Sequence, residues 1–278
     1  MPVTVRTGAI MKSQASSQLS SEGPLRILLN GHTPTGDDLQ HPALINYGHF
    51  TSMQVRSGRV RGLHLHLERI QRSHRELFGH GIDLDHARDL MRFAVEEMPD
   101  SYLRAMFFEQ HPGRLSVMTA QRPPVAANTE PVSLLPVEYQ RPVAHIKHVG
   151  TFCKIFHSVQ AERAGYDDAL HISVDGFVSE TTGANIGFYD GTQVVWPTQP
   201  SLPGVTWHLL ETALSTNGTP SVREPVDVRD LGSFAAAFLT NSMGVAPIGE
   251  IGTVPMGDPT HIVAELRSIY DQIPWDEI

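Results

Sequence analysis

Two residues of the chain, Lys147 and Glu180, have side chains suited to chemistry on a carbonyl compound. The whole chain contains only three lysines: Lys12, Lys147 and Lys154. A lysine amine can form a Schiff base with a carbonyl group, and a nearby carboxylate is what a protonated pyridine nitrogen needs. A lysine buried beside apolar or cationic groups also has a lowered pKa, which frees its amine to attack an aldehyde.

The elements that must position these two side chains can be predicted from the residues around them. An amphipathic run follows Lys147 and predicts a helix, and ALHISV (169–174) predicts a strand. Asp175-Gly176 predicts a turn, after which Glu180 stands at the start of a second strand. We therefore expect a helix, a strand, a turn and a strand to carry the two groups.

The composition limits the kind of protein this is. A chain of 278 residues can form one large or two modest domains. The net charge of −9 argues against a nucleic-acid partner, and the single cysteine, Cys153, fits a reducing, cytoplasmic location. No apolar run approaches the roughly 20 residues that a membrane span needs, so we expect no membrane partner. Residues 1–24 are Ser-rich and are predicted to form a flexible tail, with a transit peptide as the weaker alternative.

The pattern before residue 123 predicts a small α/β domain. Its expected elements are a strand and turn at 25–31, a hairpin around Ser57-Gly58, helices at about 63–78 and 83–98, and a hairpin turning at 111–113. The Pro- and Ala-rich stretch 123–131 predicts a linker. The predicted domains are therefore 25–122 and a larger one, 132–278, which carries Lys147.

Several motifs follow one another in the second half of the chain: IKHVGTF, GYDDAL, DGFVSETTGANIGFYDG, VVWP and LPGVT. In this order and at these intervals they resemble the fold-type IV pyridoxal-phosphate enzymes, or class IV aminotransferases. That family includes branched-chain and D-amino-acid aminotransferases and aminodeoxychorismate lyase. The resemblance covers the chain from about residue 25 onward. It implies a two-domain α/β (α+β) fold, pyridoxal 5′-phosphate at the domain interface, and a homodimer.

The resemblance also implies the catalytic residue. In the family the cofactor lysine precedes the helix by a few residues and lies about 33 residues before the glutamate, which matches Lys147 and Glu180. Lys154 lies inside the helical run, so we expect it on the helix surface. Glu180 is the expected partner of the pyridine nitrogen. Thr181 and Thr182 are expected to support the ring or the phosphate through their hydroxyls.

The expected phosphate site combines a guanidinium with a helix N-terminus. HLERI resembles the family segment whose arginine reaches the phosphate, which implies Arg69. LPGVT precedes a predicted helix, whose free amides form an anion site. We therefore expect Gly204, Val205 and Thr206 to meet the phosphate opposite Arg69. The Thr240-Asn241-Ser242 turn resembles the family's phosphate- and substrate-facing turn, which implies Thr240 and Asn241 at the cofactor and Asn241 and Ser242 at the substrate.

Two departures from the family affect the substrate more than the cofactor. The family's GDG is replaced by Asn46-Tyr47-Gly48 ahead of the strand expected to face the substrate, from which we predict Phe50 and Ser52 as substrate contacts. Trp207 stands where the family commonly has arginine. The substrate, its stereochemistry and the pathway therefore stay open.

Histidines are numerous, with 15 in the chain, but their spacing predicts no metal site. His64-x-His66 has no cysteine or carboxylate partner at metal-ligand spacing. We expect these histidines to be packed or solvated, and no metal to bind.

Three functions are compatible with these residues. The leading prediction is an aminotransferase that moves an amino group between an amino acid or amine and a 2-oxo acid through a lysine Schiff base. The first alternative is 4-amino-4-deoxychorismate lyase, favoured by the LLNG opening, the FTS strand and the TNS turn. The second is a non-catalytic relative that serves as a binding or scaffold protein, which the combination of Lys147, Glu180, Arg69 and PGVT argues against.

Overall fold

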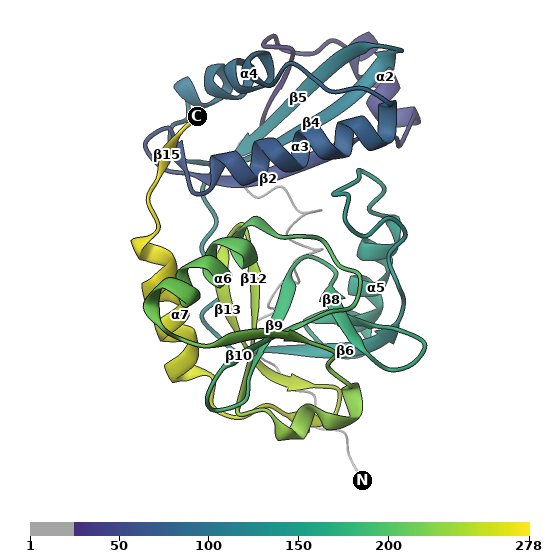
Figure 1. The fold of residues 1–278 in the computed structure, drawn as a ribbon. Helices are drawn as coiled ribbons and strands as arrows, with labels where there is room; N and C mark the ends of the chain where they lie inside the picture. Colours follow the sequence, from purple (N-terminus) through teal and green to yellow (C-terminus); the bar gives the residue numbers. More distant parts are fainter. Residues whose placement is uncertain (1–24) are drawn as a thin grey trace.

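The computed structural model describes residues 25–278, which form two large sheets, each flanked by helices, and one two-stranded sheet (Figure 1). The predicted tail, residues 1–24, lies outside the described residues. Within 25–278, no helix combines the length and the apolar character that crossing a membrane requires.

The first sheet has four antiparallel strands in the order β1-β5-β4-β2. Its strands are β1 (Arg26–Leu29), β2 (His49–Val55), β4 (Ser101–His111) and β5 (Arg114–Arg122). Two helices, α3 (Leu63–Phe78) and α4 (Leu84–Glu96), bury one apolar face each against it. The resulting core contains Met53, Leu103 and Phe107 from the strands, with Ile70 and Met91 from the helices.

Local chemistry explains where these elements begin and end. Ser57 and Gly58 adopt positive φ in the turn between β2 and β3 (Arg59–Val60), while Gly79 ends α3 in the left-handed conformation. The Asp83 carboxylate accepts a hydrogen bond from the His86 amide and caps α4. These predicted boundaries are confirmed. The sequence analysis missed α2 (Gly36–Leu44), which a capping box between Thr35 and Asp38 initiates.

The second sheet has nine strands and closes on itself. Its main path is β11-β10-β9-β12-β13-β6-β7-β8, and β14 pairs with β13. Because β8 also pairs with β9, the strands β9, β12, β13, β6, β7 and β8 form a closed barrel. The strands are β6 (Val132–Glu138), β7 (Asp168–Ile172), β8 (Val178–Thr181), β9 (Asn185–Tyr189), β10 (Val194–Pro197), β11 (Ser221–Glu224), β12 (Ala236–Asn241), β13 (Gly244–Ile251) and β14 (Val254–Pro255).

Helices cover this sheet from outside. They are α5 (Phe152–Arg163), α6 (Val205–Asn217), α7 (Thr260–Gln272) and the short 3-10 helix η1 (Val228–Ser233). Leu210, Leu214 and Leu266 of α6 and α7 pack against Phe238 and Val245 of the sheet. A separate apolar cluster that includes Leu134, Leu170, Ile186 and Ile248 is built from the barrel strands.

The chain passes between the two sheets twice. Residues 123–131 connect β5 to β6, and after α7 the strand β15 (Asp276–Glu277) returns to pair with β3. Ile278 is buried in the core of the first sheet, and the Asp276 carboxylate accepts a hydrogen bond from the Leu63 amide at the start of α3. Residues 276–278 thus pack with the first sheet, although they follow the second in sequence. The division into independently folding domains stays a prediction.

Candidate active site

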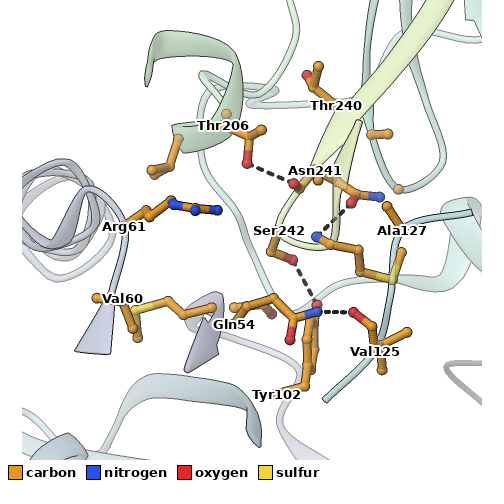
Figure 2. Close-up of a pocket in the computed structure, with 18 of the residues that line it drawn as sticks. Gln54, Val60, Arg61, Tyr102, Val125, Ala127, Thr206, Thr240, Asn241 and Ser242 are labelled. Carbon is orange, nitrogen blue, oxygen red and sulfur yellow. Dashed lines mark hydrogen bonds between the residues drawn. The ribbon is translucent and has the colours of Figure 1, made fainter. Parts of the chain in front are cut away.

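A cavity of about 590 Å³ lies between the two sheets. The first sheet contributes Phe50, Ser52 and Arg104, while the other half of the chain contributes Lys147 and Glu180. The remaining predicted residues that line it are Arg69, Gly204, Val205, Thr206, Thr240, Asn241 and Ser242. One wall of this cavity, around Thr206 and the Thr240–Ser242 turn, is shown in Figure 2.

Backbone hydrogen bonds to the start of β2 position Lys147. The Phe50 amide donates to the Lys147 carbonyl at 2.8 Å, and the Val149 amide donates to the Gly48 carbonyl at 3.0 Å. Gly48 has a φ of +154°, and a Cβ there would lie 2.7 Å from the Phe107 carbonyl oxygen, so only glycine fits. This glycine is the one that the Asn46-Tyr47-Gly48 segment keeps from the family's GDG.

The amine of Lys147 ends in the cavity, 4.8 Å from the centroid of the Phe50 ring. Burial, followed by the charges of Lys154, Arg69, Arg141 and Arg104, lowers the pKa of Lys147 well below its ordinary range. The amine is therefore neutral at a much lower pH than that of an exposed lysine. A neutral amine is the form that attacks a carbonyl carbon and accepts a proton.

The prediction that Lys154 lies on the helix surface is wrong. Its side chain lines the cavity, and burial lowers its pKa to about 8, an effect that the Glu180 charge partly offsets. The helix turns the opposite way from the expected one, because Phe152 and Phe156 are 73% and 47% exposed. Phe152 and Phe156 of α5 therefore face outward, and the side of the helix that carries Lys154 reaches the cavity.

Glu180 is buried, and both of its carboxylate oxygens accept hydrogen bonds. Arg141 Nε donates to one carboxylate oxygen at 2.8 Å, and the Leu202 amide donates to the other at 3.1 Å. Burial alone would raise the pKa of Glu180, but the charges of Arg141 and Lys154 hold it below the ordinary value. Glu180 lies within β8, one residue before its end, rather than at the strand's start.

Arg141 was missed by the sequence analysis. Besides Glu180, its guanidinium donates to the carbonyls of Ile146, at 2.7 Å, and of Ala144. One buried side chain thus fixes the carboxylate and the loop that carries Lys147. An arginine in an irregular loop belongs to no periodic pattern, and its position six residues before Lys147 was the only available signal.

The hydroxyls of Thr181 and Thr182 are engaged by other groups of the protein. The Thr181 hydroxyl accepts a hydrogen bond from the Ala184 amide, and the Thr182 hydroxyl donates to the Asp168 carboxylate at 2.7 Å. Neither side chain lines the cavity. The Thr181 hydroxyl thus satisfies an amide of the turn after β8, and the Thr182 hydroxyl ties that turn to β7.

An anion cradle lies where α6 begins. Gly204 is the N-cap, and no side chain caps the helix, so the first amides are left for another acceptor. A Cβ on Gly204 would lie 2.0 Å from Asn185 Oδ1, which explains the glycine. Asn185 in turn donates to the Leu202 carbonyl at 2.7 Å and holds the loop. The Thr206 hydroxyl donates to the Asn241 carbonyl at 2.7 Å (Figure 2) and is therefore already engaged.

Arg69 forms the opposite side of this cradle. It donates to Thr51 Oγ1 at 2.8 Å and to the Pro203 carbonyl at 3.3 Å. Its Nε, like Thr240 Oγ1, is buried without a hydrogen-bond partner among the described residues. Burial lowers the pKa of Arg69 to about 10, which still leaves it charged at neutral pH. Unsatisfied donors beside a free helix N-terminus are suited to a phosphate.

The Thr240–Ser242 turn links the two halves of the cavity. Ser242 Oγ lies 3.0 Å from the Tyr102 hydroxyl of β4, and Asn241 Oδ1 accepts a hydrogen bond from the Met243 amide (Figure 2). Trp207, by contrast, does not line the cavity. Its ring packs 5.8 Å from that of Trp196 and beneath the Arg223 guanidinium, so the departure at this position affects the core.

Of the two histidines in His64-x-His66, His66 is packed inside the protein and His64 is solvated. His66 is buried, and its Nδ1 lies 2.6 Å from Thr51 Oγ1, the same hydroxyl that Arg69 contacts. His64 is exposed on the other side of α3. The pair forms no joint site.

The family is decided by a match to the model of the amino-transferase class IV family over residues 48–251. The chain belongs to this family. As expected of a class IV aminotransferase family member, its fold is the mixed α/β, two-domain fold of the fold-type IV enzymes.

The chain is also similar to particular proteins of known sequence or structure. A probable branched-chain-amino-acid aminotransferase of Synechocystis is 28% identical over 113 residues, which are 40% of this chain and 37% of that one. A hypothetical aminotransferase from Mycobacterium tuberculosis in PLP-bound form has a TM-score of 0.76 at 21% identity, covering 89% and 98% of the two chains. 4-Amino-4-deoxychorismate lyase from Pseudomonas aeruginosa has a TM-score of 0.75 at 19% identity, covering 89% and 99%. The chain thus aligns with less than half of the curated relative's length, while the fold likeness covers nearly whole chains.

Proposed function

We propose that the chain is a pyridoxal-phosphate-dependent aminotransferase that moves an amino group between an amino acid or amine and a 2-oxo acid. The observation that carries this proposal is the position of Lys147. Its amine lies in a cavity that has an anion cradle on one wall and a clamped carboxylate on another. The PLP-bound relative from M. tuberculosis supports the choice of cofactor.

The residues present fit pyridoxal 5′-phosphate. Arg69, Thr240 and the amides of Val205 and Thr206 would hold the phosphate, and their unsatisfied donors support this assignment. Glu180 would hold the protonated ring nitrogen, and Lys147 would hold the aldehyde carbon. When bound, the cofactor supplies an aldehyde and an electron-withdrawing ring that stabilises negative charge on the substrate's Cα.

The protein's own groups then supply binding and proton transfer. Arg141 keeps Glu180 ionised, so the carboxylate favours a proton on a partner nitrogen. The lowered pKa of Lys147 favours its neutral amine, which would take a proton from the substrate's Cα and deliver it to the former aldehyde carbon on the other side of the substrate nitrogen. Arg69 and the N-terminus of α6 fix the phosphate end throughout.

Arg104 is the proposed anchor for the substrate's carboxylate. Its guanidinium stacks 3.8 Å from the Phe50 centroid, on the same ring that Lys147 contacts, and has no carboxylate partner among the described ion pairs. Basic side chains outnumber acidic ones around the cavity: Arg56, Arg61, Arg69, Arg104, Arg122, Lys147, Lys154 and Arg267 against Glu180 and Asp271. This excess favours substrates that carry at least one carboxylate.

The lyase stays the second candidate. Ser52 and the Asn241-Ser242 turn, which favoured it in the sequence, line the cavity. Lys147 and Glu180 serve either reaction, because expulsion of a leaving group and reprotonation both follow proton removal from Cα.

A single experiment separates the candidates. Protein loaded with pyridoxal phosphate would be mixed with L- and D-amino acids, amines and aminodeoxychorismate while the cofactor's absorbance is followed. An aminotransferase converts the cofactor to its amine form when a donor is added, and the aldehyde form returns when a 2-oxo acid is added. A lyase releases pyruvate from aminodeoxychorismate without an acceptor. A chain with no visible band, even after cofactor is added, contradicts the proposal and favours a scaffold.

The proposal includes a homodimer and a cytoplasmic location. The exposed Phe152 and Phe156 on α5, stacked with centroids 5.9 Å apart, support a partner surface. The cytoplasmic location rests on the single cysteine.

A further inference from the structure

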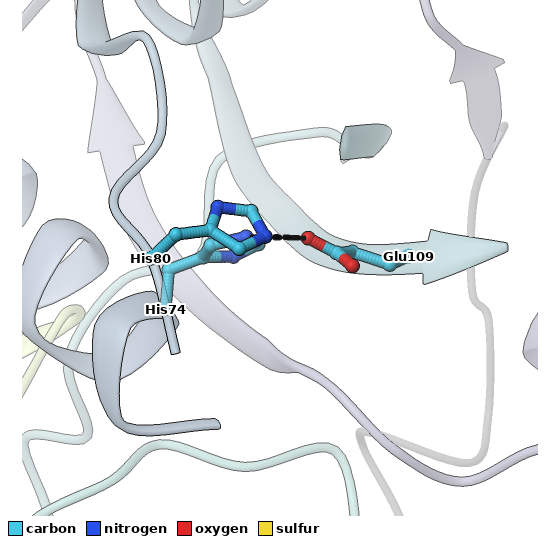
Figure 3. Close-up of side chains that lie close together, drawn as sticks. All are labelled: His74, His80 and Glu109. Atoms are coloured by element: carbon cyan, nitrogen blue, oxygen red, sulfur yellow. Dashed lines mark hydrogen bonds and ion pairs between the residues drawn. The ribbon is translucent and has the colours of Figure 1, made fainter. Parts of the chain in front are cut away.

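Three potential metal ligands converge at the far end of the first sheet, outside the cavity: His74, His80 and Glu109 (Figure 3). His74 belongs to the last turns of α3, His80 follows the glycine that ends α3, and Glu109 lies on β4. Glu109 Oε1 lies 2.8 Å from His80 Nε2 and 3.2 Å from His74 Nε2. All three ligand atoms lie within 4.8 Å of one another.

These separations are close to those of a single coordination shell. Zinc ligands at about 2.0–2.2 Å in a tetrahedron lie roughly 3.3–3.6 Å apart. One ion can therefore sit among the three atoms once the Glu109 contacts of 2.8 and 3.2 Å lengthen slightly and the two imidazole nitrogens, which lie within 4.8 Å of each other, draw together by up to about 1.5 Å. Two imidazoles with one carboxylate favour zinc and its neighbours in the first transition series over magnesium or calcium, which prefer oxygen ligands.

Two ligands of this cluster are buried and the third is partly exposed to solvent. The side chains of His74 and Glu109 are 0% and 6% exposed, whereas that of His80 is 44% exposed. An ion could enter from the His80 side, and water could complete the fourth position.

Outer contacts orient the two buried ligands. His49 Nε2 lies 3.2 Å from His74 Nδ1, and the Gly113 amide donates to Glu109 Oε2 at 2.7 Å. If His74 Nδ1 carries the proton and donates it to His49, then His74 Nε2 is free to bind the ion. Such outer-shell partners are typical of metal-binding histidines.

We propose that His74, His80 and Glu109 bind one zinc-class divalent ion, which ties the end of α3 to β4. The ligands come from a helix, a loop and a distant strand, so their spacing in the sequence matches no metal motif; this is why the sequence analysis predicted none. Because His74 contacts His49, the residue before Phe50, the ion would also brace one wall of the cavity. Without an ion, the two imidazoles can only share Glu109 as a hydrogen-bond acceptor.

The test uses the full chain, stripped with a chelator and titrated with zinc chloride against a chromophoric chelator. We expect about one ion per chain, and a cobalt(II) form with the strong visible absorbance of a four-coordinate site. His80→Ala and Glu109→Gln should each weaken zinc binding at least 10–100-fold, the loss typical even of outer-shell changes. His64→Ala, an exposed histidine on the same helix, should leave it unchanged.

Thermal unfolding provides the second readout. Zinc should raise the Tm of the parent chain and of His64→Ala, and should leave the Tm of the two ligand variants nearly unchanged. His80 is half exposed, so His80→Ala is expected to fold, and normal cofactor loading would verify this. The proposal is overturned if the parent chain binds no zinc, or if both ligand variants bind zinc as tightly as the parent.

Discussion

At the residue scale, the two cavity lysines provide the sharpest test. We expect Lys147→Ala to abolish borohydride-trappable pyridoxal phosphate, because the reacting amine is gone. Lys154→Met should keep full trapping, although Lys154 also reaches the cavity with a pKa of about 8. Mass spectrometry of the reduced, digested protein would identify the modified lysine. Label on Lys154 in the parent chain would refute the assignment of Lys147.

The lowered pKa of Lys147 predicts how cofactor capture depends on pH. Only the neutral amine attacks the aldehyde, and its fraction rises with pH up to the lysine's own pKa. Capture by the stripped protein should therefore reach its plateau well below pH 10.5, the ordinary lysine value. Stopped-flow absorbance after mixing with pyridoxal phosphate would measure this profile. A rate that still climbs at pH 10 would show that the amine is not perturbed.

Glu180→Gln separates the electronic role of the carboxylate from its packing. The amide keeps the shape and can still accept from the Leu202 amide, but it cannot stabilise a protonated ring nitrogen. Cofactor affinity should change little, since Lys147, Arg69 and the α6 N-terminus are untouched. Proton removal from a good amino donor should slow by about 10²–10³, as expected for the loss of one preorganised charge. An unchanged half-reaction rate would exclude Glu180 as the nitrogen's partner.

At the element scale, the N-terminus of α6 depends on one close approach. Gly204→Ala places a methyl group against Asn185 Oδ1, although φ at this position, −73°, suits alanine. The helix start should shift, and pyridoxal-phosphate affinity should fall by about one to two decades, the cost of a weakened charge-assisted contact. In an Asn185→Ala background the same substitution should cost much less. Equal losses in both backgrounds would show that the clash is not the cause.

The elements also show what the sequence could and could not predict. The end of α3 at Gly79, the start of α4 after Asp83 and the turn at Ser57-Gly58 were predictable, because the residues that cause them lie within a few positions in the sequence. The orientation of α5 was not, because the exposure of Phe152 and Phe156 reverses the usual rule for an amphipathic helix. Of the thirteen residues that the motifs assigned to the cofactor or the substrate, all except Thr181 and Thr182 line the cavity. The motifs could not reveal Arg141, whose role depends on contacts between a loop and a strand distant in sequence.

At the scale of the whole molecule, the exposed phenylalanine pair Phe152 and Phe156 on α5 predicts an interface. Phe152→Asp combined with Phe156→Asp should shift a homodimer towards monomer, because it puts charges into a desolvated contact. Analytical ultracentrifugation over a range of concentrations would measure the shift. Phe93→Asp, a phenylalanine on α4 that is about as exposed as Phe156, is the control. A double variant as dimeric as the parent would place the interface elsewhere.

The return of β15 to the first sheet has a consequence for how the protein is made. The residues of the first sheet and its helices leave the ribosome early, yet their core includes Ile278 and their helix α3 takes a hydrogen-bond acceptor from Asp276. Those residues are synthesised only after the whole barrel. The first sheet and its helices are therefore translated early but completed late, and during most of translation β3 has no β15 to pair with.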